Sequence, residues 1–584
     1  MQDQLRVLGS CQAWHPGLFR QMARTSSGIT LEFETDSSEI IVELKLDSEP
    51  KGTREILDIA RALRRGRSHD EICQSPSTQH AWDGIGIDID GRQLPVFLPA
   101  PKDECFSFLL EDPKDAPLEG SVQLPMFGGT HQVRIHLPLL RSVLVGKVWG
   151  NGSFITPWHH DLPHLLMLGD SVAQGFICGD PRLNYPHLLA DDLHMQLINQ
   201  SIGGQVFQPG LLWGMAAHID PKLIIVDLGD NYRYEPCSKR LVSRDIHNYF
   251  EELHRLWPQV PTLVITPIWN NDEIYPIHRL SCAREVPQLI EHKVAALSNV
   301  FVANGQNLIE HTSSYMADYY GHPGVRGHRE IAERLHIAHE ALMLKTSADY
   351  RARAKTRALQ LMEHAPRSAY PLLYNVHHDI GTLVYADDHL VLLDYTEAYM
   401  LYSDDEQLMI RVLEAIRPER GVCLFNAKFA HACLEVLGRK ALFPYASCIY
   451  ESKKKRRLAA SRHFAALDRS YLPIIQKHYK YAQDVPEAQL LAALDRGSFI
   501  GGFEGDELIG FIGEHAYGSI GMLEVFHPHR LKGWGRALMS YKINEYLEAG
   551  RLPWSEIMQD NKASYELHKS MGFLIFPFEN QVWM

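Results

Sequence analysis

The strongest constraint on this chain is an apolar run over 165–168 that ends in Gly169-Asp170-Ser171. A run of this length and composition predicts a buried strand, with the Ser171 hydroxyl at its carboxyl end. Ligands of open α/β sheets bind at that edge. Ser171 is therefore a candidate nucleophile, provided that a base and oxyanion donors come from elsewhere in the chain.

More apolar runs follow, and helix-like segments separate them. The runs span 223–228, 262–266 and 300–303, and the helix-like segments span 185–194, 246–257, 286–297 and 327–345. Continuous apolar strands that alternate with helices predict a parallel sheet covered on both faces, over about residues 162–345.

The sequence has 584 residues, which is too long for one core and predicts three or four domains. Its formal net charge is −13, from 58 basic and 71 acidic residues, which argues against a uniformly nucleic-acid-binding surface. Nine cysteines without a CxxC pair argue against a disulfide framework or a structural zinc site. No metal site is expected, and His159-His160-Asp161 is interpreted as solvated surface.

The location expected from the sequence is the cytoplasm. The first residues lack the long apolar stretch of a signal peptide. No apolar run reaches the roughly 18 residues that a membrane span requires. We therefore expect no membrane and no nucleic-acid partner, and we leave the oligomeric state open.

Residues 1–150 alternate with a period of two between Gly, Pro and Asp breaks, which predicts a β-sandwich. One helix is expected near 54–65. The alternating strands are expected at 29–35, 40–46, 121–124 and 131–137. Beyond residue 345, the pattern predicts a helix over 348–365 and a hairpin over 381–393.

Four polar blocks occur at the predicted strand ends of the central region. They are Gly169-Asp170-Ser171, Asn199–Gly204, Gly229-Asp230-Asn231 and a block that contains Asp318 and His322. Acyl transfer by a serine needs such a set. His322 would take the proton of Ser171, while the backbone N–H groups of Ser171 and Gly204 and the amide of Asn231 would bind the oxyanion.

These blocks resemble the SGNH hydrolases, also called the GDSL esterase and lipase superfamily, over roughly 162–345. The resemblance implies a flavodoxin-like, doubly wound α/β domain with an ester hydrolase site. The family usually has Asp three residues before the histidine. Here that position is Tyr319 and Asp318 lies four before His322, so a triad with Asp318 and a Ser–His dyad both stay open.

His328 also competes for the base role, but its place at a helix start predicts a surface or capping residue. A β-sandwich ahead of such a domain is similar to the arrangement in several carbohydrate esterases.

A second constellation lies near the C-terminus. A strand that ends in Leu523-Glu524-Val525 leads into Arg530-Leu531-Lys532-Gly533-Trp534-Gly535-Arg536 and then a helix. Backbone N–H groups at such a helix start form an anion site. Downstream, Asn561–Phe573 predicts a helix closed by glycine.

Together these elements resemble the GNAT acyl-CoA N-acyltransferases. The resemblance implies an α+β fold and acetyl-CoA as the bound acyl donor. Glu524 is the candidate base, with a solvated strand residue as the alternative. His568 replaces the tyrosine that often protonates the departing thiolate, and Tyr565 is the other candidate. The implied cofactor-binding residues are Val525, Arg530, Lys532, Gly533, Trp534, Gly535, Arg536 and Asn561.

The segment 426–438 is similar in sequence to the closing helix of Asn561–Phe573, but no Arg-x-x-Gly-x-Gly motif precedes it. Residues 346–450 therefore resemble a degenerate tandem copy of the same fold. The sequence thus predicts a multidomain chain: a β-sandwich (1–150), an SGNH hydrolase (162–345), a degenerate GNAT-like half (346–450) and a GNAT acetyltransferase (458–584).

The function predicted is a bifunctional enzyme. It would remove acetyl or other short acyl groups from O-esters, with a carbohydrate as the expected substrate, and acetylate a small amine from acetyl-CoA. The esterase domain would need no cofactor. Two alternatives remain: an interaction protein with one silent site, and an SGNH O-acyltransferase, since hydrolysis and transfer share the acyl-enzyme.

Overall fold

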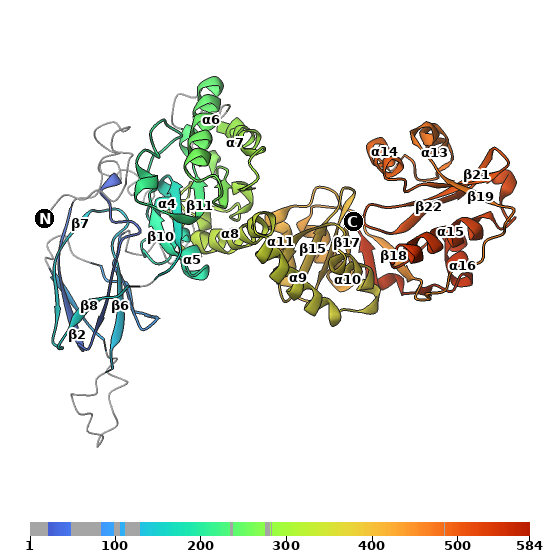
Figure 1. The fold of residues 1–584 in the computed structure, drawn as a ribbon. Helices are drawn as coiled ribbons and strands as arrows, with labels where there is room; N and C mark the ends of the chain where they lie inside the picture. Colours follow the sequence, from blue (N-terminus) through green and yellow to red (C-terminus); the bar gives the residue numbers. More distant parts are fainter. Residues whose placement is uncertain are drawn as a thin grey trace, which may run out of the picture. The chain divides into compact units, whose positions relative to one another are not determined.

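The computed structural model describes residues 22–47, 83–98, 105–110, 129–159, 161–233, 238–274, 281, 283–483 and 485–584. The helix expected at 54–65 and the strand expected at 121–124 lie outside these residues. The chain forms two compact units, Met1–Leu342 and Met343–Met584. Figure 1 shows the elements of both.

The N-terminal part of the first unit contains two antiparallel sheets. Their orders are β4-β3-β6-β1-β8 and β5-β2-β7. Alternate residues of both sheets, such as Val42, Ile87 and Val133, share one hydrophobic core, as the period-two pattern predicts. The strands are β1 (Thr30–Thr35), β2 (Glu39–Leu46), β3 (Gly86–Ile89), β4 (Arg92–Gln93), β5 (Cys105–Leu109), β6 (His131–His136), β7 (Val143–Gly150) and β8 (Ile155–Pro157).

The second part of this unit is a five-stranded parallel sheet in the order β10-β9-β11-β12-β13. This is the flavodoxin-like order, whose topological switch point lies between the first and third strands. These are β9 and β11, so Ser171 and Asn231 follow the two strands that flank the switch point. The strands are β9 (His164–Gly169), β10 (Gln196–Asn199), β11 (Pro221–Asp227), β12 (Thr262–Ile265) and β13 (Val300–Ala303).

Helices cover both faces of the parallel sheet. One buried cluster joins the sheet to α6 and α7, and another joins its other face to α5 and α8. Helix α6 begins earlier than the predicted 246 because its first turns are polar and hide the apolar spacing that starts at Val242. The helices are α4 (Ser171–Gln174), α5 (Tyr185–Asp192), α6 (Lys239–Leu256), α7 (Val286–Val294) and α8 (Val325–Thr346).

The second unit is built on one twelve-stranded sheet that runs β14-β15-β16-β17-β25-β18-β23-β22-β21-β20-β19, with β24 paired to β18. The last strand of the chain, β25, lies between β17 and β18, two strands of the preceding half. The strands are β14 (Thr382–Ala386), β15 (Leu390–Asp394), β16 (Ala398–Ser403), β17 (Gly421–Leu424), β18 (Phe443–Ile449), β19 (His463–Ala466), β20 (Ile500–Glu504), β21 (Glu507–Glu514), β22 (Ile520–Val525), β23 (Trp554–Met558), β24 (Leu574–Ile575) and β25 (Gln581–Trp583).

The expected helix over 348–365 and the expected hairpin over 381–393 are both present, as α9 and the antiparallel pair β14–β15. The helices are α9 (Ala348–Glu363), α10 (Tyr370–His377), α11 (Glu406–Ile416), α12 (Ala430–Val436), α13 (Leu472–His478), α14 (Glu487–Asp495), α15 (Trp534–Glu548) and α16 (Lys562–Ser570). Among the helices of the described residues, none has the length and apolar character needed to cross a bilayer.

Candidate active sites

The candidate nucleophile is held at the first turn after β9. Ser171 is the first residue of α4, and the side chain of Asp170 caps this helix by accepting a hydrogen bond from the N–H of Val172 (3.0 Å). The Oγ of Ser171 lies 3.0 Å from Nε2 of His322. Ser171 and His322 are 151 residues apart in the sequence, and the fold brings them together at one edge of the parallel sheet.

The far side of the His322 ring contacts Asp318. Its Nδ1 lies 2.6 Å from Oδ2 of Asp318, while Oδ1 accepts the backbone N–H groups of residues 320, 321 and 322. Burial alone would raise the pKa of Asp318, but the charge of His322 and these hydrogen bonds outweigh it and hold the pKa below its usual value. Of the two arrangements left open by the sequence, the geometry is that of a triad.

The loop that carries Asp318 explains how a four-residue spacing works. Tyr319 is fully buried and takes a left-handed conformation (φ 62°), which is uncommon for a non-glycine residue. The N–H of Ala317 donates to the carbonyl of His322 (2.7 Å), and Met316 pairs with Pro323. This tight loop folds the Asp318 carboxylate back beneath the ring.

The predicted oxyanion donors approach Ser171 from two loops. Gly204 adopts φ 84°, a conformation that a side chain would strain. Its N–H, like that of Ser171, donates to no described residue. The amide of Asn231 donates to Oδ2 of Asp170 (2.8 Å) and to the carbonyl of Gln205 (3.1 Å). Both amide protons of Asn231 are thus engaged in this state.

Three buried carboxyl groups, Asp170, Asp227 and Asp230, lie behind the nucleophile. Burial raises the pKa of each, neighbouring carboxylates add to this effect at Asp170 and Asp227, and the pKa of Asp227 reaches about 7. The hydroxyl of Tyr185 donates to Asp227 at 2.6 Å. This cluster fixes the ends of β9 and β11 around Ser171.

The expectation that His328 is a surface or capping residue is wrong. The side chain is fully buried, stacks on Tyr185 and accepts the N–H of that residue at Nδ1 (3.3 Å). Burial lowers the pKa of His328 to about 3, so the ring is neutral. The helix start faces the sheet rather than solvent, and His328 belongs to the core beside the site.

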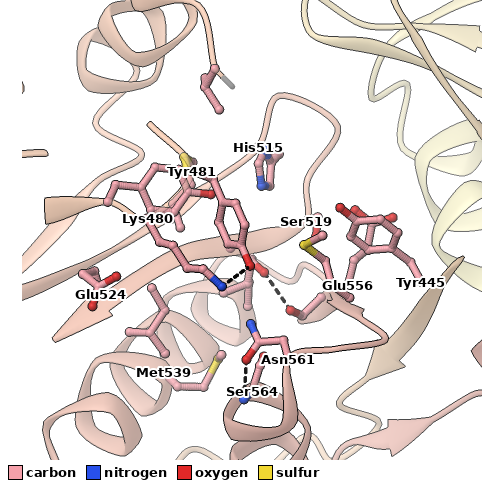
Figure 2. A pocket seen from close by; sticks show the side chains of 18 of the residues that line it. Tyr445, Lys480, Tyr481, His515, Ser519, Glu524, Met539, Glu556, Asn561 and Ser564 are labelled. Carbon is pink, nitrogen blue, oxygen red and sulfur yellow. Dashed lines mark hydrogen bonds between the residues drawn. The ribbon is translucent and has the colours of Figure 1, made fainter. Parts of the chain in front are cut away.

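The second site is a pocket of about 840 Å³ in the C-terminal unit. Strands β22 and β23 are parallel but pair only between Ile520 and Ser555, so they diverge and open the sheet. The pocket is lined by both strands, by the start of α16 and by the segment 479–481 (Figure 2). Glu524, Val525, Arg530, Asn561 and His568 are the predicted site residues on its wall.

The predicted diphosphate loop ends at the start of α15. Gly533 is the N-cap residue of this helix, takes φ 80° and provides no side-chain cap, so the N–H groups of the first turn stay available to an anion. Arg462 stacks on Trp534 (4.6 Å) and donates to the carbonyls of Lys532 and Gly533 (both 2.8 Å). Trp534 is buried, so only its backbone faces a ligand.

Arg530 folds back onto β22. Its guanidinium donates to the carbonyl of Val525 (2.9 Å) and to Oε1 of Glu524 (2.8 Å). Lys532 is exposed, and the exposed Arg536 donates to Oγ of Ser570 (2.8 Å). The charge of Arg530 is therefore directed at Glu524 in this state.

His568 is 2% exposed and lies on the pocket wall. Its Nδ1 is 2.7 Å from the carbonyl of Ser564, which only accepts, so this nitrogen carries the proton. In the neutral ring Nε2 then has a lone pair, and it has no described partner. Burial lowers the pKa of His568. These features favour a hydrogen-bond acceptor over the proton donor implied by the resemblance. Asn561 caps α16 through the N–H of Ser564 (3.1 Å).

Sequence reasoning missed several residues of the second site: Arg462, Lys480 and Glu556. Arg462 precedes the loop that it holds by about 70 residues, and Lys480 and Glu556 reach the pocket from other elements. A glutamate in the apolar strand Trp554–Met558 was the one available signal. Among the described residues, no group of His, Cys, Asp and Glu has the arrangement of a metal site.

The first unit thus brings Ser171, His322 and Asp318 together at one edge of a parallel sheet, and the second opens a pocket between β22 and β23. Family comparisons find one known family in each unit. The description "GDSL-like Lipase/Acylhydrolase family" matches residues 167–330, and "Acetyltransferase (GNAT) family" matches residues 464–573. The chain contains one domain of each family. A comparison with curated proteins found no match.

Several solved structures resemble the first unit at low identity. A salicylyl-acyltransferase, SsfX3, from a tetracycline biosynthetic pathway is 16% identical over 57% of this chain and 89% of its own, with a TM-score of 0.42. A carbohydrate esterase family 2 enzyme from Corynascus thermopiles is 12% identical over 55% and 95%, at 0.38. A family two carbohydrate esterase from Clostridium thermocellum is 14% identical over 52% and 89%, at 0.35.

Proposed function

We propose that the protein is a bifunctional enzyme, a serine esterase for short acyl O-esters and an acetyl-CoA-dependent N-acetyltransferase for a small amine. The observation that carries the esterase half is the continuous contact from Ser171 through His322 to Asp318, at 3.0 and 2.6 Å. A cytoplasmic location stays part of the proposal and rests on the sequence alone.

In the first step, Oγ of Ser171 attacks the ester carbonyl while Nε2 of His322 takes its proton. The C–O bond to the alcohol breaks, and His322 returns the proton to the departing alkoxide. Asp318 stabilises the doubly protonated ring, which fits the low pKa of its carboxyl group. Water then attacks the acyl-enzyme with His322 as base and releases the free acid and Ser171.

The developing oxyanion needs donors that are fixed in advance. The N–H groups of Ser171 and Gly204 serve because they donate to no described residue. Asn231 joins them by releasing one of its bonds, to Asp170 or to Gln205. We therefore assign the larger share of the stabilisation to the two backbone groups.

The esterase half is tested with a fluorophosphonate probe, which modifies only an activated serine. Wild type is expected to be labelled at Ser171, and Ser171→Ala is expected to be unlabelled and to lose hydrolysis of acetyl esters. Equal turnover of acetyl esters by wild type and Ser171→Ala would contradict the proposed esterase function. A panel of acetyl, butyryl and longer nitrophenyl esters with acetylated sugars defines the substrate, and acylated sugar products would indicate O-acyl transfer instead.

Two observations support acetyl-CoA as the ligand, one at the start of α15 and one on the pocket wall. The first turn of α15 offers N–H groups beside Gly533 for a diphosphate, and Nε2 of His568 is a buried acceptor without a partner. The loop Arg530–Gly535, Arg536 and Asn561 would hold the cofactor, with Val525 along the pantetheine arm. Bound there, acetyl-CoA supplies an acetyl group as a thioester.

The residues of the chain then manage protons and orientation. Glu524 takes a proton from the acceptor amine as its nitrogen forms the new C–N bond and the C–S bond breaks. Arg530 donates a hydrogen bond to Oε1 of Glu524 and holds this carboxylate in place. Nε2 of the neutral His568 ring can only accept a hydrogen bond. The departing thiolate therefore takes its proton from solvent.

Calorimetry with acetyl-CoA tests the transferase half. We expect one binding event per chain, which Gly535→Trp abolishes by filling the approach to the α15 N-terminus. A matched exchange at a distant glycine, Gly129→Trp, where no atom lies within 4 Å of an added Cβ and φ is not left-handed, is expected to retain binding. Absence of binding by the wild type would remove the transferase function.

The domain boundaries belong to this proposal. The two sheets at 1–150 form a β-sandwich accessory domain, supported by their common core, and a carbohydrate ester is the preferred substrate because of this domain. The SGNH domain covers 162–345 and the GNAT domain 458–584. Residues 346–450 form the degenerate copy, supported by the sheet they share with the GNAT domain.

A further inference from the structure

The pocket of the C-terminal unit contains an acidic group that the acetyl-transfer chemistry leaves unused. Glu556 on β23 lies on the pocket wall. Its Oε1 accepts hydrogen bonds from the indole of Trp583 (3.0 Å) and the amide of Gln581, and its Oε2 accepts one from the hydroxyl of Tyr517 (3.0 Å). The thiol of Cys423 is a fourth, longer donor to Oε1 (3.9 Å), so the carboxylate is held in one orientation by four donors, all of them neutral.

In the described part of the chain, no lysine or arginine forms an ion pair with Glu556. The basic side chain that acts electrostatically on Glu556 is His515, but its Nδ1 lies 3.2 Å from Oε2 of Glu397 instead. Burial accordingly raises the pKa of Glu556. Buried charges are normally paired with an opposite charge. The carboxylate of Glu556 has a fixed orientation and faces a cavity but has no cationic partner among the described residues, and a ligand can supply one.

The surroundings of Glu556 are aromatic. Tyr517 packs against Trp583 (5.5 Å between ring centroids) and stacks on His515 (5.0 Å), and Tyr445 packs against Trp583 on the other side (6.4 Å). All of these rings line the pocket. Aromatic faces beside a carboxylate are the environment that binds ammonium groups, through charge and cation–π attraction.

Glu556 lies apart from the candidate base, Glu524 (Figure 2). Ile520 pairs with Ser555, so Glu524 lies three residues further along its strand than Glu556, about 10 Å along the strand at the usual rise, and the divergence of β22 from β23 adds to this separation. Hydrogen bonds of ~2.8 Å at both ends of a span of about 10 Å leave roughly 4 Å between two nitrogens, and more where the strands diverge. One small molecule can therefore reach both carboxylates.

We propose that the acceptor of the transferase is an aliphatic diamine, whose charged ammonium group binds Glu556 between Tyr445, Tyr517 and Trp583 while its second amine meets Glu524. This assignment rests on the proposed transferase function and adds the substrate class. Tyr445 and Trp583 come from β18 and β25, where the two halves of the sheet join. The degenerate half thereby contributes to acceptor recognition.

Binding is tested first, because it does not depend on turnover. Calorimetry of the full chain compares 1,4-diaminobutane with 1-aminobutane. Wild type is expected to bind the diamine at least about tenfold more tightly, the size of effect expected for a desolvated charge pair. Glu556→Gln should lose this preference, and Asp506→Asn, a change at an exposed turn, should keep it. Equal affinity of wild type for the two amines would overturn the proposal without any variant.

Turnover separates this inference from the proposed function. With release of the CoA thiol as the readout, Glu556→Gln should raise KM for the diamine at least about tenfold, change kcat little and leave KM for the monoamine unchanged. Its affinity for acetyl-CoA should equal that of wild type. If acetyl-CoA binds but both amines react alike, the diamine assignment is wrong and the transferase stands. If acetyl-CoA does not bind, the transferase and the acceptor role both fail, and the diamine preference then tests only whether Glu556 binds an ammonium group.

Discussion

Two carboxyl groups, one in each unit, are held by several hydrogen-bond donors and still differ in the direction of their pKa shifts. Asp318 has a histidine partner on its own chain, His322, and its pKa lies below the usual value. Glu556 has only neutral donors, and burial raises its pKa. The proposed esterase site therefore has its partners within the chain, whereas the proposed transferase site is completed by its ligand.

The largest effect is expected at the carboxylate that already has its partner. Asp318→Asn should lower kcat for acetyl-ester hydrolysis by roughly 10³–10⁴-fold, because the amide favours the wrong tautomer of His322. Steady-state kinetics with a nitrophenyl acetate measure this loss, and Asp36→Asn at an exposed loop is the control. A loss of less than tenfold would mean that the site works as a Ser–His dyad.

The pH dependence of Asp318 follows from its low pKa. Its charge stabilises the fold above the unfolded value of about 3.9, and this contribution disappears as the pH falls through the folded pKa. Thermal unfolding of wild type and Asp318→Asn should therefore differ most at neutral pH and converge in strong acid. A difference that grows below pH 4 would contradict the assigned charge state.

A smaller effect is expected from the residue that holds the diphosphate loop. Arg462→Ala removes the donors to the carbonyls of Lys532 and Gly533 and should weaken acetyl-CoA binding about tenfold, since two charged hydrogen bonds are lost. Calorimetry measures the affinity. Arg469→Ala, at an exposed ion pair with Asp495, serves as the matched control and should bind normally. Unchanged affinity in Arg462→Ala would show that the loop keeps its shape unaided.

A substitution of His568 tests whether this residue accepts a hydrogen bond or acts as the general acid. If the neutral ring only accepts a hydrogen bond, His568→Gln, whose amide oxygen can replace Nε2, should keep kcat within about tenfold of wild type, because general acid catalysis is not lost. The pH profile of kcat should keep its shape. A loss of about 10²-fold or more, with a lost basic limb in the profile, would restore the proton-donor role.

The smallest effect concerns stability at Glu556. Its raised pKa means that the charge costs stability above the unfolded value of about 4.3, most fully above the folded pKa. Glu556→Gln should then melt about 2 °C higher than wild type at pH 8, as expected for ~1 kcal/mol in a unit of this size, with no gain in strong acid. Scanning calorimetry measures the shift, and 1,4-diaminobutane should stabilise only wild type. A variant that melts lower at pH 8 would mean that the charge is already paired.

Local sequence was sufficient for much of the first site. Apolar strands that end in short polar blocks place Ser171, Gly204, Asn231 and His322 at one sheet edge, because parallel strands share their carboxyl ends. The contact of Asp318 stayed open between a triad and a dyad, since it depends on the left-handed Tyr319. The burial of His328 was missed because a helix start usually faces solvent.

The second pocket shows where sequence reasoning stops. Its proposed phosphate loop follows from glycines close together in the chain, and a helix follows this loop as expected, beginning at Trp534. The proposed acceptor end is assembled from β18, β22, β23 and β25, and the placement of the last strand between β17 and β18 depends on pairing between distant segments. Periodicity gives the existence of these strands but not their neighbours, so the sequence did not show which residues surround Glu556.

The most direct test of two separate active sites in one chain assays two single variants for both reactions. Ser171→Ala should lose ester hydrolysis and acetylate amines at the wild-type rate, and Glu524→Gln should lose acetylation and hydrolyse esters at the wild-type rate. A variant that loses both activities while it remains folded, or a retained activity where loss is predicted, would contradict the account.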